Sequence, residues 1–216
     1  MKDRSILCES REEELANSIS HAIGAVLSAV GLGAMLKLAA PLSFWHVLGV
    51  SVFGTSLVLL YVASALYHTV VSHRSKRLLQ ILDHALIFVL IAGSYTPWLL
   101  VNLRGPWGWS LLAAVWAIAL SGTVLKILLL PRFDKLGTVL YIAMGWLICV
   151  ALKPLIENVD AVALAWLVAG GLAYTGGVAF YVKRNVRFAH FTWHLFVMVG
   201  SLCHVIAVIV GVLVPR

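Results

Sequence analysis

Seven long apolar segments divide this chain of 216 residues. They cover residues 19–37, 47–70, 83–101, 110–130, 137–153, 161–182 and 191–213. Each is too long for a strand, and only a helix satisfies all of its backbone hydrogen bonds in hydrocarbon without closing a barrel. Because about 20 apolar residues span a bilayer, the sequence predicts an all-α membrane protein, a bundle of seven transmembrane helices.

The composition of the chain fits a lipid environment. Hydrophobic residues make up 62% of the chain and charged residues 12%, and the mean hydropathy is +0.98, whereas soluble domains are roughly half apolar and about a quarter charged. We therefore expect a short cytoplasmic N-terminal segment (residues 1–18) and one seven-helix transmembrane domain (residues 19–216). The three cysteines form no CxxC pair, so we expect neither a disulfide framework nor a thiolate metal cluster.

The basic residues predict how the chain is oriented. They lie in short turns between the apolar segments rather than on one continuous face, so the net charge of +7 does not indicate a nucleic-acid partner. The N-terminal segment and every second connection carry 12 of the 16 lysines and arginines, including Lys126, and the other side carries four. The positive-inside rule then places the N-terminus in the cytoplasm and the C-terminus outside.

Five polar side chains are expected at one depth, near the cytoplasmic face. With this orientation the second segment ends there with Ser64 and His68, the third begins there with Asp83, and the seventh begins there with His190 and His194. Ionisable groups are unfavourable inside membrane helices, and where they occur they usually mark a functional site. We therefore expect these five residues to converge.

Three histidines and a carboxylate are typical of a zinc site. His68, His190 and His194 would supply three ligands, and catalytic zinc sites keep the fourth position for water. Asp83 would hold or deprotonate that water, and Ser64 would orient Asp83. Taken on these residues alone, histidines bonded to backbone or lipid headgroups remain an alternative. So does a Ser-His-Asp triad with Ser64 as the nucleophile, although that triad leaves two histidines unexplained.

Other polar residues flank this set. Glu14, Asn17 and His21 lie at the start of the first segment, where we expect them to cap the helix; contact with the rim of the site is the alternative. His84 points about 100° away from Asp83 around the helix, and His204 is expected to be a buried, hydrogen-bonded histidine.

Several separated motifs, in order along essentially the whole chain, resemble the hemolysin III family. This family is the bacterial branch of the progestin and adipoQ receptor superfamily, which includes the adiponectin receptors. The matching segments are Glu14-Leu15-Ala16-Asn17-Ser18-Ile19-Ser20-His21, Ala63-Ser64-Ala65-Leu66-Tyr67-His68, Asp83-His84, Gly93-Ser94-Tyr95-Thr96-Pro97, Tyr174-Thr175-Gly176-Gly177, and the pattern of His190, His194 and His204.

The resemblance implies seven helices, a cytoplasmic N-terminus and an intramembrane Zn²⁺ near the cytoplasmic face. The ligands that it implies are His68, His190 and His194, with Asp83 contacting zinc through water and Ser64 beside it. The superfamily also includes alkaline ceramidases, which resemble zinc-dependent lipid amide hydrolases. The long N-terminal extension of the adiponectin receptors has no counterpart here, which argues against hormone reception.

These expectations lead to a functional hypothesis and two alternatives. The leading hypothesis is a multi-pass protein of the bacterial cytoplasmic membrane that hydrolyses a lipid amide or ester with zinc and contributes to membrane lipid homeostasis. Its partner would be a membrane lipid, either as substrate or as bound fatty acid. The alternatives are a receptor-like membrane regulator with structural zinc and a hemolysin-type lytic protein.

Overall fold

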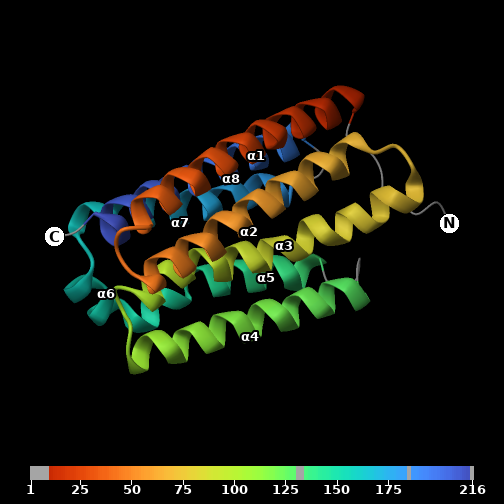
Figure 1. The fold of residues 1–216 in the computed structure, drawn as a ribbon. Coiled ribbons are helices and arrows are strands. Elements are labelled where there is room, and N and C mark those ends of the chain that lie inside the picture. The colour runs from red at the N-terminus through yellow and green to blue at the C-terminus, as the bar shows by residue number, and fades with distance from the viewer. Residues whose placement is uncertain (1–9, 130–133, 184–185, 215–216) are drawn as a thin grey trace.

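The computed structural model describes residues 10–129, 134–183 and 186–214. Within these residues the chain is all-α, and its helices lie side by side along one long axis (Figure 1). The helices are α1 (Arg11–Ala39), α2 (Phe44–Thr69), α3 (His73–Leu100), α4 (Pro106–Leu129), α5 (Asp134–Gly145), α6 (Leu152–Asn158), α7 (Ala161–Tyr181) and α8 (Ala189–Val208). Among the described residues, seven helical stretches are long and apolar enough to cross a membrane, which confirms the predicted number of spans.

Helix α1 carries its polar residues inward and its apolar residues outward. Its buried residues include Glu13, Asn17, Ser20 and His21, while large apolar side chains such as Val26, which is 65% exposed, face outward. A soluble helix has the opposite arrangement. This inverted pattern is the one expected of a helix whose outer face meets lipid and whose inner face forms part of a site.

The first helix begins earlier than the hydropathy pattern predicts. The side chain of Ser10 caps it by accepting a hydrogen bond of 3.2 Å from the backbone N–H of Glu13. Three glutamates in the first turn complement the positive end of the helix dipole. Residues 11–18, expected in the N-terminal segment, therefore form the first two turns of α1.

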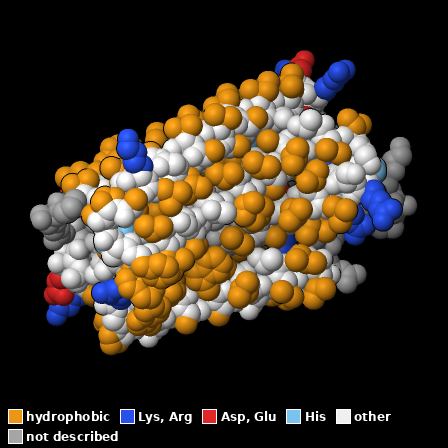
Figure 2. Space-filling model, viewed as in Figure 1, with side chains coloured by type: hydrophobic (Ala, Val, Ile, Leu, Met, Phe, Trp, Pro, Cys, Tyr) orange, Lys and Arg blue, Asp and Glu red, His pale blue; other side chains and the backbone are white. Residues whose placement is uncertain are grey.

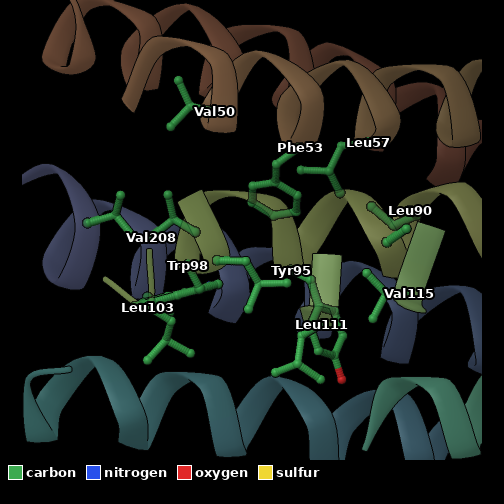
Figure 3. Packing of buried hydrophobic residues seen from close by; sticks show 14 of the residues in the cluster. Val50, Phe53, Leu57, Leu90, Tyr95, Trp98, Leu103, Leu111, Val115 and Val208 are labelled. Atoms are coloured by element: carbon green, nitrogen blue, oxygen red, sulfur yellow. The ribbon is translucent and has the colours of Figure 1, made fainter. Parts of the chain in front are cut away.

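Helix α2 packs between α1 and α3, and α8 packs against α7 and α1. At Gly49 the backbones of α2 and α3 come so close that an added Cβ would lie 2.8 Å from the Cα of Pro97, the kind of approach that small residues allow between membrane helices. Figure 3 shows Phe53 and Leu57 extending from α2 toward the aromatic side chains of α3, Tyr95 and Trp98. These residues belong to one buried apolar cluster.

The outer surface has the charge distribution of a membrane protein. In Figure 2, hydrophobic side chains cover the visible flank along its length, and charged side chains lie toward the two ends. Helix α1 begins at one end of the bundle and α8 finishes at the other (Figure 1). An odd number of spans requires this separation.

The fifth span is interrupted, although the sequence predicts one continuous helix over residues 137–153. A short 3-10 turn (Leu147–Ala151) separates α5 from α6. The hydroxyl of Tyr95 on α3 lies 2.8 Å from the carbonyl oxygens of Met144 and Gly145 and accepts a 3.0 Å hydrogen bond from the N–H of Ile148. Non-helical backbone is tolerated at membrane depth where protein groups satisfy it, and Tyr95 does so here.

Candidate metal centre

Three histidines from two helices come together at one end of the bundle. His68 lies near the end of α2, and His190 and His194 lie one turn apart at the start of α8. One ring nitrogen from each can be chosen such that all three lie within 4.8 Å of one another. The ring centroid of His68 is 5.1 Å from that of His190 and 5.0 Å from that of His194. This group can hold a metal ion.

The start of α8 is fixed by an unusual backbone conformation. Phe188, directly before the helix, has a φ of 58° and lies in the left-handed region, which is uncommon for a residue with a large side chain. The chain therefore turns sharply before Ala189. As a result His190 lies in the first turn of α8, with His194 one turn further on the same side.

The Nδ1 nitrogen of His68 is already engaged. It lies 2.9 Å from Oε2 of Glu14 on α1, and the other carboxylate oxygen of Glu14 accepts a 2.8 Å hydrogen bond from Nζ of Lys76 on α3. The Nε2 nitrogen of His68 is buried and has no hydrogen-bond partner among the described residues. Only Nε2 is therefore free to act as a ligand.

His194 is enclosed by residues of α1. Its Nδ1 nitrogen lies 3.4 Å from the hydroxyl of Ser20, and the ring of His21 stacks on it with a centroid distance of 3.5 Å and an angle of 9°. His21 is 3% exposed, and neither of its ring nitrogens has a partner among the described residues. These contacts make α1 the outer wall of the site.

Asp83 lies beside the histidines with two further polar residues. Its carboxyl group interacts with Ser64, and electrostatically with His68, His190 and Lys126. The Ser64 hydroxyl, however, does not meet full hydrogen-bond geometry with any described residue. Lys126 of α4 is completely buried. Ionisable groups inside membrane helices usually face the bundle interior, near groups of opposite charge, and Asp83 and Lys126 follow this rule.

A small cavity joins these groups. Its volume is about 20 Å³, and Ser64, Asp83, His190, His194 and His21 are among its lining residues. A water molecule needs about 10–15 Å³, so the cavity has room for little more than an ion and a water.

Buried polar atoms without partners are rare in proteins, yet His68 Nε2, Ser64 Oγ and both nitrogens of His21 occur together here. Three imidazoles also match a known zinc donor set, so the residues fit the implied Zn²⁺.

A larger cavity adjoins the small one. Its volume is about 120 Å³, and it shares Leu60, Ile87, Tyr181, Trp193 and Val197 with the small cavity. Most of its lining is apolar or aromatic, and His204 lies in its wall. An engineered apolar cavity of about 150 Å³ binds benzene, so this cavity has the size and polarity to hold part of an apolar ligand.

The structure brings all five expected residues together. Ser64, His68, Asp83, His190 and His194 meet at one end of the bundle, as their expected depth implies. The expectation that Glu14, Asn17 and His21 cap α1 is wrong, because Ser10 is the cap. Glu14 and His21 instead contact the histidines of the candidate metal centre.

Two further residues belong to the site although sequence reasoning placed them elsewhere. Lys126, counted among the cytoplasmic basic residues, is buried within α4 near Asp83. A lysine inside an apolar segment was the signal that could have revealed it. His84 lines the small cavity despite its angular offset from Asp83.

Comparison with known proteins identifies relatives over most of the chain. A family model described as "Haemolysin-III related" matches residues 9–205. The protein named Hemolysin-3 of Bacillus cereus is 45% identical over 191 residues, covering 88% of this chain and 87% of its own length. The Hemolysin-3 homolog of Bacillus subtilis is 42% identical, covering 88% and 90%. The human Monocyte to macrophage differentiation factor is more distant, at 28% identity over 202 residues, covering 91% and 83%. This chain is thus a member of the haemolysin-III-related family.

Proposed function

We propose that this protein is an integral membrane, zinc-dependent hydrolase of lipid amide or ester bonds. The observation that carries the proposal is the group of His68, His190 and His194. Two of these histidines, His190 and His194, line one small cavity together with Asp83. We place it in the bacterial cytoplasmic membrane, with the site near the cytoplasmic face and a role in lipid homeostasis.

The residues of the site would divide the chemistry among them. His68, His190 and His194 would hold the zinc, which when bound polarises a carbonyl group and lowers the pKa of water to about 7. Asp83 would accept the proton of the attacking water as a general base. Ser64 would orient the Asp83 carboxylate, with which it interacts. Lys126 would balance the charge of Asp83 in the low-dielectric interior.

The larger cavity supports a lipid as the substrate. It is mostly apolar and shares a wall with the small cavity, so an acyl chain within it would bring a carbonyl group toward the histidines. Gly171 on α7 contributes to its lining.

The second candidate function is a receptor-like membrane regulator with structural zinc. The small volume of the inner cavity, about 20 Å³, favours this alternative, because a substrate carbonyl could enter only if the helices moved apart. Such a protein would respond to lipid through rearrangement of its helices. It would retain zinc and hydrolyse no lipid.

Lytic activity is the function that the name Hemolysin-3 implies for the Bacillus cereus relative. In this chain the buried ionisable residues of the candidate centre gather at one end of the bundle. Most of the residues that line the larger cavity are apolar. These features support a closed site better than an aqueous pore, so we rank lysis third.

Metal content and lipid turnover test the proposal together. Protein purified in detergent is expected to contain about one zinc per chain, and the His68→Ala and His190→Ala/His194→Ala variants are expected to lose it while keeping their helicity. His73→Ala, an exposed histidine at the start of α3, is the matched control and should keep its zinc. Asp83→Asn should lower turnover in a panel of lipid amides and esters by at least about 100-fold.

The outcomes separate the candidate functions. Zinc in the wild type without turnover of any lipid class would favour the regulator. Full turnover by Asp83→Asn would exclude the role given to that residue. A well-folded wild type that takes up no zinc even when it is supplied would exclude both functions that depend on the metal.

A further inference from the structure

The carboxylate of Glu14 connects three helices at the metal centre. Its Oε2 atom lies 2.9 Å from Nδ1 of His68 on α2, and its Oε1 atom lies 2.8 Å from Nζ of Lys76 on α3. The His68 side chain is 1% exposed, that of Lys76 14% and that of Glu14 22%. The carboxylate is therefore held on both sides and only partly hydrated.

His68 needs such a partner because of its position. It is the penultimate residue of α2, which ends at Thr69, and the last turn of a helix tends to fray. His190 and His194, in contrast, are fixed relative to one another because they lie one turn apart on one helix. The helix backbone alone therefore orients His68 less firmly than the other two histidines.

The contact with Glu14 also decides which ring nitrogen of His68 faces the cavity. A carboxylate accepts a hydrogen bond from Nδ1–H, and the ring then presents an unprotonated Nε2. That Nε2 is buried and has no partner among the described residues. Histidines that bind metals commonly donate their other ring N–H to a carboxylate, which fixes the tautomer and makes the nitrogen ligand more basic.

We propose that Glu14 is a positioning residue of the metal centre, which binds Nδ1 of His68 so that Nε2 points to the ion. Lys76 pairs with the other oxygen of this carboxylate but does not touch His68. The inference rests on the proposed function in one respect, the binding of a metal by His68, His190 and His194. Glu14 touches neither the ion nor the substrate and acts only through His68.

Metal affinity tests this role independently of any enzymatic activity. Zn²⁺ affinity of the full chain in detergent, measured by competition with a chromophoric chelator, is expected to fall about 100-fold in Glu14→Ala and about 10-fold in Glu14→Gln. The glutamine variant should lose less, because its amide oxygen still accepts a hydrogen bond from Nδ1–H. In Co²⁺-loaded protein, the visible absorption spectrum should change in Glu14→Ala, because His68 would be displaced from its orientation.

Two control variants separate positioning from general stability. Glu12→Gln removes a carboxylate two residues away that pairs with Arg187 at the surface, and should leave the affinity unchanged. Lys76→Gln removes the ion pair with Glu14 but keeps the contact with His68, and should change the affinity less than threefold. Unfolding of the metal-free proteins shows whether each variant folds; if Glu14→Ala does not, Glu14→Gln carries the test.

Different experimental results would refute this inference and the proposed function. If the wild type binds zinc and both Glu14 variants bind it equally well, Glu14 has no positioning role and the proposed function stands. If Lys76→Gln weakens binding as much as Glu14→Ala, the effect comes from helix packing and the inference is wrong. If the wild type binds no metal, both proposals fall.

Discussion

Lys126 and Asp83 place two ionisable groups of opposite type inside the bundle. Lys126 is completely buried in α4, Asp83 is 7% exposed and lies within α3 near the histidines, and the two interact electrostatically. Removing one of two buried groups of opposite charge leaves the other less compensated in a medium of low dielectric constant, which is destabilising. Lys126 therefore has a structural role even if it takes no part in the chemistry.

This pairing predicts a non-additive pair of substitutions. In the wild type, Lys126→Met is expected to lower the free energy of unfolding by about 3 kcal/mol. In a protein that already carries Asp83→Asn, the same substitution should have an effect that is smaller by at least about 1 kcal/mol. Chemical denaturation in detergent measures both, with Lys37→Met, an exposed lysine near the end of α1, as the control. Additive effects would show that Lys126 depends on a partner other than Asp83.

Single side chains also show what a sequence can predict about a membrane site. His68, Asp83 and the α8 histidines were predictable, because each is an ionisable group within an apolar segment and its depth follows from the order of the spans. The contact of Glu14 with His68 was not predictable, because an acidic residue at the start of a helix is equally well explained as a favourable partner of the helix dipole. Only the packing of α1 against α2 distinguishes the two roles.

At the scale of helices, the interrupted fifth span depends on a residue from another helix. Residues 137–152 are apolar, Lys153 ends the segment, and the whole segment predicts an unbroken helix; it contains no glycine-proline pair that marks a break. The break between α5 and α6 is stabilised by the Tyr95 hydroxyl of α3. Because the stabilising group lies about 50 residues away in the chain, periodicity and composition could not have predicted the break.

Tyr95→Phe tests this explanation. Loss of the hydroxyl leaves the Ile148 N–H and two carbonyl oxygens without their partner, so we expect the free energy of unfolding to fall by about 1–3 kcal/mol. Hydrogen exchange of the amides at residues 146–149 should accelerate. Tyr141→Phe, which removes the 2.7 Å hydrogen bond to the backbone oxygen of His84, should leave that exchange unchanged. Equal protection of residues 146–149 in both variants would refute the explanation.

For the whole molecule, the sequence predicts the number of spans better than their lateral arrangement. Hydropathy is a local property, and the seven spans follow from it directly. Which helix packs beside which depends on small residues such as Gly49 that permit close contact only with a complementary neighbour. The meeting of the five polar residues was predictable for a different reason. Successive spans alternate in direction, which fixes the depth of each residue in the membrane and does not depend on which helices lie side by side.

Orientation in the membrane is the remaining prediction at this scale. The excess of lysine and arginine on the side where α1 begins predicts that the candidate metal centre lies toward the cytoplasm. In a background with Cys8, Cys149 and Cys203 replaced by alanine, a membrane-impermeant maleimide applied to intact cells should label Ser43→Cys, at the start of α2, but not Ser75→Cys, at the start of α3. Both positions are exposed, and both should react once the cells are permeabilised. Labelling of Ser75→Cys alone in intact cells would show the opposite topology, with the histidines near the outer face. The site would then take zinc from outside the cell and lipids from the outer leaflet.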